Sequence, residues 1–136
     1  MADAMQEPKP RAKHRRLEDA LHVQVAKYLR AVIGPERTCC NGVAWESIET
    51  RGRRSLAEGA RNRARGCVAG TPDIHICYRG CEYHIELKAG KGTTTTEQLS
   101  WHEAFGQAGA TIAVCRTLDD VRECLETWRV PTREAK

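Results

Sequence analysis

The chain has 136 residues, of which 40% are hydrophobic and 29% charged, as is typical of one globular domain. No run of about 18 apolar residues is present to span a bilayer, and the basic N-terminus has no apolar stretch behind it, which disfavours membrane and secreted proteins. The expected compartment is the cytoplasm, where the seven scattered cysteines would be reduced thiols.

The basic residues are unevenly placed along the chain. Residues 1–16 and 51–65 together hold eleven of the 22 Lys and Arg but only three of the 18 Asp and Glu. Positive segments on a slightly acidic body are typical of proteins that bind a polyanion, most simply nucleic acid. A solvated basic tail and a basic loop explain the same composition equally well.

The N-terminal third is predicted to be an arm followed by a helix. Residues 1–15 contain two prolines, many charges and hardly any large apolar residue, which favours a flexible basic arm. From Leu17, apolar side chains recur at helical spacing until Gly34-Pro35, so a helix is expected over residues 16–33. Five residues form this stripe: Leu17, Leu21, Val25, Tyr28 and Val32.

Residues 36–66 give a weak signal. Short strands are possible at 39–45 and at Ser47-Ile48, and the Gly- and Arg-rich stretch after Thr50 is expected to be an irregular loop. The sequence does not order this region further.

The clearest structural signal is a β-hairpin from Asp73 to Lys88. If Arg79-Gly80 forms its tight turn, Tyr78 faces Cys81 and the register follows. Alternation then divides the hairpin into an apolar face and a polar face. The apolar face comprises Ile74, Ile76, Tyr78, Tyr83, Ile85 and Leu87, and the polar face comprises Asp73, His75, Glu82, His84, Glu86 and Lys88.

The C-terminal third is predicted to be helix, strand, helix. Thr96 is expected to cap a helix that ends near Gly109, residues 110–115 form a short apolar strand, and Thr117 caps a last helix that ends before Pro131. Counting a strand in the weak region, the order is α-β-β-β-α-β-α. We therefore expect an α/β fold with a mixed central sheet flanked by helices.

The hairpin register brings chemistry to one place. Asp73 faces Glu86, and opposed residues on adjacent strands have Cβ atoms about 5 Å apart. Two carboxylates at such a short distance need a cation between them. Hard oxygen ligands suit Mg²⁺ or Mn²⁺, and such an ion can activate water and offset charge on a phosphate. Lys88, on the same face, can orient that water or stabilise developing negative charge. Each residue alone is more simply an exposed charge on a strand, but the register brings all three together.

These residues resemble a known family. Gly70-Thr71-Pro72-Asp73-Ile74, then Ile85-Glu86-Leu87-Lys88, then Gln98 with Trp101, is similar to the VRR-NUC domain of the PD-(D/E)xK nuclease superfamily. The resemblance covers roughly residues 16–127 and implies a restriction-endonuclease-like mixed central sheet flanked by helices. It implies that Asp73 and Glu86 hold the divalent metal, that the main-chain carbonyl of Leu87 joins them, and that Lys88 is catalytic.

The resemblance implies two supporting residues. Glu18 matches a Glu on the family's first helix that helps to bind metal, although an acidic residue in a helix's first turn also has a purely structural use. Gln98 matches the family's helix Gln, which supports the site or touches substrate, although it could equally be solvated.

The family also implies partners. Stand-alone members occur in phages and bacteria and look like homodimers that act on branched DNA, including four-way junctions, whereas fused members trim flaps. This chain departs from the simplest members in its long Arg-rich stretch, which leaves the substrate geometry open. We expect six arginines to bind the phosphate backbone: Arg51, Arg53, Arg54, Arg61, Arg63 and Arg65.

A zinc site at His75, Cys77, Cys81 and His84 is disfavoured. On the hairpin register Cys81 lies on the other face, and neither a Cys-x-x-Cys spacing nor a second ligand pair is present. His75 and His84 lie beside the carboxylates and could contact substrate, but structural histidines are slightly favoured.

The sequence therefore predicts a metal-dependent DNA endonuclease. Its domain is expected over residues 16–130, after the arm at 1–15 and before a tail at 131–136. The first alternative is a nucleic-acid-binding module that keeps the fold without cutting, against which the complete Asp, Glu and Lys set argues. The second is an interaction protein whose basic segments dock an acidic partner, with no metal dependence. We expect no membrane contact.

Overall fold

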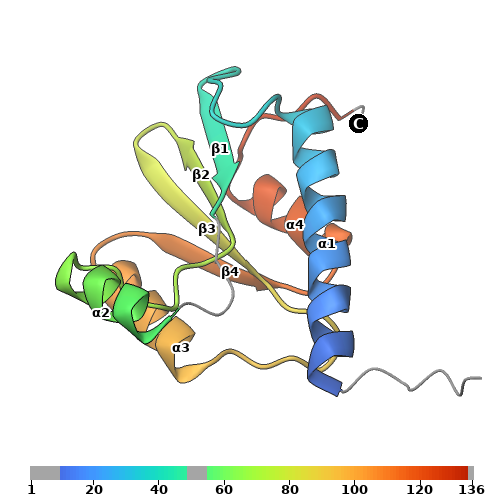
Figure 1. Cartoon of the computed structure of the whole chain (residues 1–136). Helices are drawn as coiled ribbons and strands as arrows, with labels where there is room; N and C mark the ends of the chain where they lie inside the picture. The colour runs from blue at the N-terminus through green and yellow to red at the C-terminus, as the bar shows by residue number, and fades with distance from the viewer. Residues whose placement is uncertain (1–9, 49–54, 135–136) are drawn as a thin grey trace, which may run out of the picture.

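The protein is a mixed α/β sandwich in the computed structural model, which describes residues 10–48 and 55–134 (Figure 1). Its elements are α1 (Pro10–Val32), β1 (Val43–Ser47), α2 (Leu56–Ala64), β2 (Ile74–Tyr78), β3 (Cys81–Leu87), α3 (Thr96–Gln107), β4 (Thr111–Cys115) and α4 (Leu118–Thr127). The strands form one sheet in the order β1-β2-β3-β4, with β4 parallel to β3 and the other neighbours antiparallel. The predicted mixed central sheet flanked by helices is confirmed.

The hydrophobic core lies between the sheet and the layer formed by α1 and α4 (Figure 1). Helix α1 supplies Leu21, Val25, Ala26, Leu29 and Val32, whereas Leu17 of the predicted stripe is 48% exposed. Helix α4 supplies Val121 and Leu125, because side chains three and four residues apart share one helix face. One face of the sheet supplies most of the remaining core residues, namely Val43, Trp45, Ile74, Ile76, Ile85, Leu87 and Cys115. Burying this face fixes the strand register, since a slip of one residue would turn polar side chains into the core.

The opposite face of the sheet is covered only in part. Helix α3 packs there, with the ring of Trp101 4.7 Å from that of His84, yet neither α2 nor α3 contains a buried residue. Large apolar side chains such as Phe105 and Val114 stay 47% and 41% exposed. This face therefore has room for polar groups and for access from solvent.

The predicted hairpin register is confirmed. Ile74 pairs with Ile85, Ile76 with Tyr83 and Tyr78 with Cys81. Arg79 and Gly80 both have positive φ, +50° and +75°, as a two-residue type I′ turn requires.

Helix α1 begins at Pro10, six residues before the predicted start. Proline suits the first position of a helix because its missing N–H would have no partner there. No large apolar residue lies between Pro10 and Leu17, so periodicity could not reveal these first turns. Residues 1–9 of the predicted arm lie outside the described residues.

Helix α2 was not predicted, and the expectation of an irregular loop after Thr50 is wrong for residues 56–64. The Ser55 side chain caps this helix by accepting a hydrogen bond from the amide of Glu58. The element order is therefore α-β-α-β-β-α-β-α rather than α-β-β-β-α-β-α. Among the strands suggested for this region, β1 is present at 43–47.

The helix caps of the C-terminal third follow the prediction closely. Helix α3 is capped by Thr95, one residue before the predicted Thr96, and α4 is capped by Thr117 as predicted. Beyond α4 the chain returns to α1, where the amide of Arg133 donates to the carbonyl of Val32 at 2.7 Å. Among the helices that the structure describes, none combines the length and the apolar character needed to cross a bilayer.

Candidate metal and active site

Asp73 is held in place by the backbone of β3. It directly precedes β2, and its Oδ2 accepts a hydrogen bond of 2.7 Å from the amide of Leu87. This contact fixes the Asp73 carboxylate beside the segment that carries Glu86 and Lys88. The two carboxylates are therefore neighbours, as the register predicted.

Glu86 is almost fully buried, with 2% of its surface exposed. Its Oε1 accepts a hydrogen bond of 2.6 Å from Nε2 of Gln98, while its Oε2 is buried with no partner among the described residues. Burial raises the pKa of Glu86 to about 8, and the nearby charge of Asp73 contributes to this shift. A buried carboxylate oxygen without a donor, next to a second carboxylate, fits a divalent cation that is bound between them.

Lys88 lies on the same face as Glu86 and is also buried, with 6% of its surface exposed. Its Nζ is 3.8 Å from Oε1 of Glu86. An ammonium in such a position needs anionic neighbours, and these carboxylates supply them. The arrangement presents a fixed positive charge to any group that approaches the two carboxylates.

Helix α3 supports the site through its first turn. Gln98 completes a capping box: its Oε1 accepts from the main-chain amide of Thr95 at 2.9 Å, and its own main-chain amide donates to Oγ1 of Thr95 at 3.2 Å. The same side chain donates to Glu86, so one residue both takes part in the N-terminal cap of the helix and orients the buried carboxylate. The interpretation of Gln98 as solvated is wrong, because it is half-buried against Glu86.

The loop before β2 packs closely on this turn of α3. A Cβ atom on Gly70 would lie 2.3 Å from the main-chain oxygen of Glu97, and Gly70 has φ of +113°. Only glycine fits both the conformation and the contact. Gly70 thus brings α3 against the segment that leads into Asp73.

Glu18 approaches the site from α1. Its negative charge is among those that raise the pKa of Glu86, and its Oε1 lies 3.5 Å from Nε2 of His14. His14 in turn lies so close to Gly92 that a Cβ there would be 2.4 Å from Nε2. The first turns of α1 therefore lie against the loop that follows β3.

His102 is a site neighbour that the sequence did not single out. Burial, and then the charge of Lys88, lower the pKa of His102, and its Nε2 is buried without a hydrogen-bond partner among the described residues. The available signal was its position four residues after Gln98 on one helix, which places both on one face.

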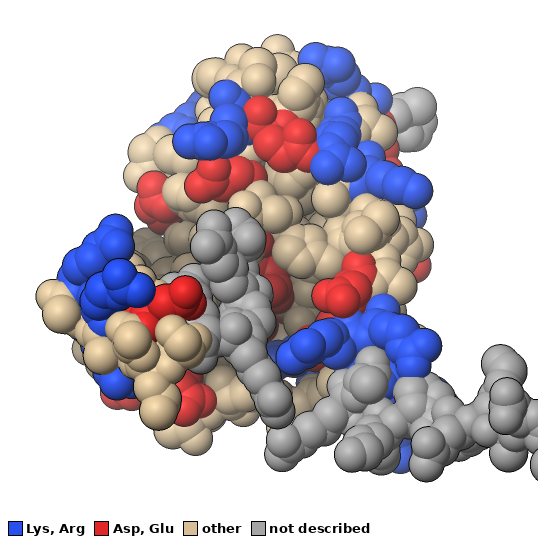
Figure 2. Space-filling model, in the orientation of Figure 1, with Lys and Arg blue, Asp and Glu red and all other residues tan. Residues whose placement is uncertain are grey.

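The predicted arginines are only partly described. Arg61 and Arg63 are exposed on α2, and Arg65 follows as the C-terminal cap. Lys and Arg side chains gather over α2 and again near the N-terminal end of α1 (Figure 2). Arg51, Arg53 and Arg54 lie outside the described residues.

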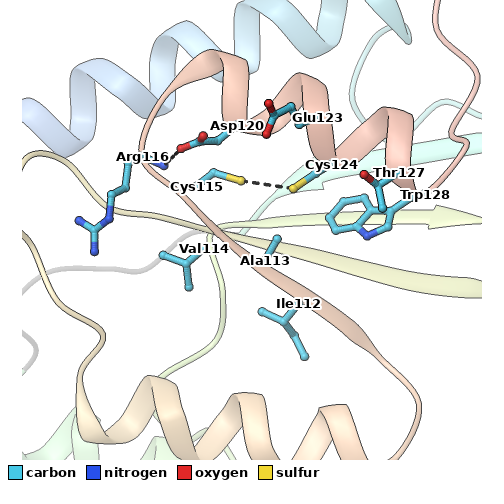
Figure 3. A pocket seen from close by; sticks show the side chains of 10 residues that line it. All are labelled: Ile112, Ala113, Val114, Cys115, Arg116, Asp120, Glu123, Cys124, Thr127 and Trp128. Carbon is cyan, nitrogen blue, oxygen red and sulfur yellow. Dashed lines mark hydrogen bonds between the residues drawn. The ribbon is translucent and has the colours of Figure 1, made fainter.

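A pocket between β4 and α4 does not include the carboxylate site (Figure 3). Its thiols, Cys115 and Cys124, lie 3.7 Å apart, and burial raises the pKa of both, so neither is a ready thiolate. Asp120 accepts from the amides of Arg116 and Thr117 as part of the α4 cap. The two thiols and Asp120 therefore have structural roles in this pocket.

No protein-family model and no curated protein matches the sequence. Among solved structures, a chain named VRR_NUC domain protein is similar over 82% of this chain and 87% of its own length, with a TM-score of 0.61 and 20% sequence identity. Fold and site geometry together define a mixed α/β protein with two carboxylates and a lysine at the end of a hairpin. Its fold is that of a VRR-NUC domain, as the resemblance predicted.

Proposed function

We propose that this protein is a divalent-metal-dependent nuclease that hydrolyses phosphodiester bonds of DNA. The observation that carries the proposal is the buried carboxylate of Glu86: its Oε2 has no hydrogen-bond partner among the described residues, the charge of Asp73 acts on it, and its Oε1 lies 3.8 Å from Nζ of Lys88. A carboxylate that is costly to bury is useful where a cation binds. The fold of the similar VRR_NUC domain protein supports the same class of function.

Asp73 and Glu86 would hold the metal, with Glu18 and the main-chain carbonyl of Leu87 as further ligands. Carboxylate and carbonyl oxygens favour Mg²⁺ or Mn²⁺ over softer ions. When bound, such an ion supplies Lewis acidity toward a phosphate and lowers the pKa of a coordinated water. The site is built from two strands and two helices, so the donor set depends on the folded chain.

The protein side chains have separate tasks in this proposal. Lys88 stabilises negative charge that develops on the scissile phosphate, and its burial strengthens that interaction by excluding water. Gln98 keeps the Glu86 carboxylate oriented through the 2.6 Å hydrogen bond. Arginines along 51–65 contact the DNA backbone and give affinity without base selection.

The finer proposal is that the substrate is branched DNA, such as a four-way junction, processed by a homodimer in replication, recombination or repair. A two-fold dimer presents two sites to the two sides of a junction. Sedimentation of the purified chain with and without junction DNA tests this assembly. A monomer that prefers flaps would replace the junction proposal and leave the cleavage proposal intact.

The test of function is cleavage of labelled four-way junction, flap and duplex DNA with Mg²⁺, Mn²⁺ or EDTA. Asp73→Asn and Lys88→Met should each lower the rate by about a hundredfold or more. Asp119→Asn and Lys27→Met are matched controls, because both residues are exposed, on α4 and α1 respectively, and should leave the rate unchanged.

Four outcomes would contradict the proposal. Metal-independent cutting, or cutting that survives Asp73→Asn, would exclude this site as the catalytic centre. DNA binding without any cutting would instead favour a nucleic-acid-binding module that keeps the nuclease fold. An absence of both would favour the interaction protein.

A further inference from the structure

A second cluster of metal-ligating side chains lies on the polar face of the hairpin. His75 on β2 pairs with His84 on β3, and Glu82, two residues before His84, lies on the same face of β3. One ligand atom from each of the three lies within 4.8 Å of the others. None of these residues has a task in the proposed cleavage reaction.

The two imidazole rings are stacked and point the same way. Their centroids are 4.7 Å apart with an interplanar angle of 7°. The Nε2 atom of His75 is hydrogen-bonded to Oε2 of Glu82, and Nε2 of His84 lies 3.6 Å from the same oxygen. Both rings thus direct their Nε2 atoms toward one carboxylate.

The ring of His84 is poorly satisfied by the protein alone. It is 7% exposed, its Nδ1 is buried without a partner among the described residues, and 3.6 Å is longer than a hydrogen bond. Tetrahedral zinc with bonds of about 2.0–2.2 Å separates its ligand atoms by about 3.4 Å. The observed distance between His84 and Glu82 is close to that value.

We infer that His75, Glu82 and His84 form a binding site for a transition-metal ion of the zinc class, separate from the Mg²⁺ or Mn²⁺ site. Imidazole nitrogen favours Zn²⁺ and its neighbours, whereas magnesium prefers oxygen. Three protein ligands leave one tetrahedral position for water or a substrate oxygen. The bound ion cross-links β2 to β3 two residues from Asp73 and from Glu86.

This ligand set differs from the His75, Cys77, Cys81 and His84 set that was disfavoured from the sequence. Cys81 lies opposite Tyr78 on the other face of the hairpin, so it cannot join the two histidines. Glu82 takes its place, because alternation puts residue 82 on the face of residue 84. Because Glu82 is half-exposed, its carboxylate can turn from the direct contact with His75 to admit an ion.

The experiment is a titration of the whole chain, stripped with EDTA and kept reduced, with ZnCl₂ in a calorimeter and with CoCl₂ in a spectrophotometer. We expect one equivalent of Zn²⁺ to bind and Co²⁺ to give the intense visible bands of four-coordinate geometry. His75→Ala and Glu82→Gln should each weaken Zn²⁺ binding by about tenfold or more. Both side chains are partly exposed, so both variants should fold.

The controls separate this site from its neighbours. Asp73→Asn removes a proposed nuclease ligand, and His22→Ala removes a histidine from α1 whose Nε2 contacts Ser47. Both should bind Zn²⁺ as the native chain does. Failure of cleavage would disprove the proposed function while leaving this result unchanged.

Three results would overturn the inference. The first is no stoichiometric Zn²⁺ binding, which would leave His75 and Glu82 as an ion pair only. The second is binding that is lost in Asp73→Asn but kept in His75→Ala and Glu82→Gln, which would put the ion in the carboxylate site. The third is a thiolate charge-transfer band with Co²⁺ that is unchanged in His75→Ala and Glu82→Gln, which would assign the ion to cysteines elsewhere in the chain.

Discussion

At the scale of single residues, burial of the Glu86 carboxylate lowers the stability of the fold but gives the proposed site a metal ligand. Its carboxylate is buried, one oxygen has no donor among the described residues, and its pKa is raised to about 8 by burial and by Asp73. Without a cation such a group destabilises the folded chain. Residues whose charge is costly in this way are commonly kept for function.

The pH dependence of stability should reveal this cost. In EDTA the folded chain keeps a proton on Glu86 that the unfolded chain releases, so the free energy of unfolding should fall as pH rises from about 5 to about 8. Glu86→Gln removes this contribution and should be more stable than the native chain at pH 9 by about 2 kcal/mol or more. Urea unfolding at pH 5, 7 and 9 measures both.

Equal pH slopes for the two proteins would contradict this account of Glu86. Glu126→Gln on α4 is a matched control, since Glu126 is exposed. It should leave the pH slope unchanged.

The proximity of Asp73 and Glu86 could be predicted because strand alternation and a two-residue turn determine it. The contact from Gln98 to Glu86 could not be placed in the same way. It depends on the path of residues 88–95, which follow no periodic pattern. A family resemblance suggested Gln98 as a site residue but gave no contact for it.

At the scale of elements, the hairpin and the last two helices were predictable, whereas α2 was not. Helix α2 buries no residue, so it has no apolar stripe for periodicity to reveal. The signal present was local: Ser55 followed three residues later by Glu58 is a capping pattern. A helix that is stabilised by its cap and by exposed charges has no buried stripe, so the periodicity of apolar residues does not predict it.

The junction between the loop before β2 and α3 gives a prediction at this scale. Gly70→Ala combines a strained φ with a Cβ 2.3 Å from the backbone oxygen of Glu97. Gly109→Ala has almost the same φ, +112°, and its Cβ would meet no atom of the described residues within 4 Å. We expect Gly109→Ala to cost about 1–3 kcal/mol from backbone strain and Gly70→Ala clearly more. Urea unfolding of both variants measures the difference.

Gly70→Ala should also weaken Mn²⁺ binding, because α3 must move away from the segment that positions Asp73. Gly109→Ala should not change it. Equal losses of stability and unchanged metal affinity in both variants would show that this close approach does not position the site.

At the scale of the whole molecule, the two faces of the sheet have different tasks. Helices α1 and α4 bury one face as a core, while α3 covers the other face only in part (Figure 1). The buried polar and charged side chains, His84, Glu86 and Lys88, are on the partly covered face. Positive side chains gather over α2, near the N-terminal end of α1 and over the upper part of the molecule in this view (Figure 2). The hydrophobic core on one face of the sheet therefore offsets the loss of stability caused by the buried charged groups on the other face.

The salt dependence of DNA binding tests whether α2 belongs to the DNA-binding surface. If Arg61 and Arg63 each neutralise a phosphate, changing both to Ala should reduce the slope of log affinity against log salt by about 1.8 for duplex DNA. Lys27→Ala with Arg133→Ala is the matched control: the same loss of two charges at exposed positions on α1 and beyond α4. It should lower affinity only slightly and leave the slope nearly intact. Equal slopes for the two double variants would mean that DNA responds to net charge alone, and α2 would then have no assigned contact with the substrate.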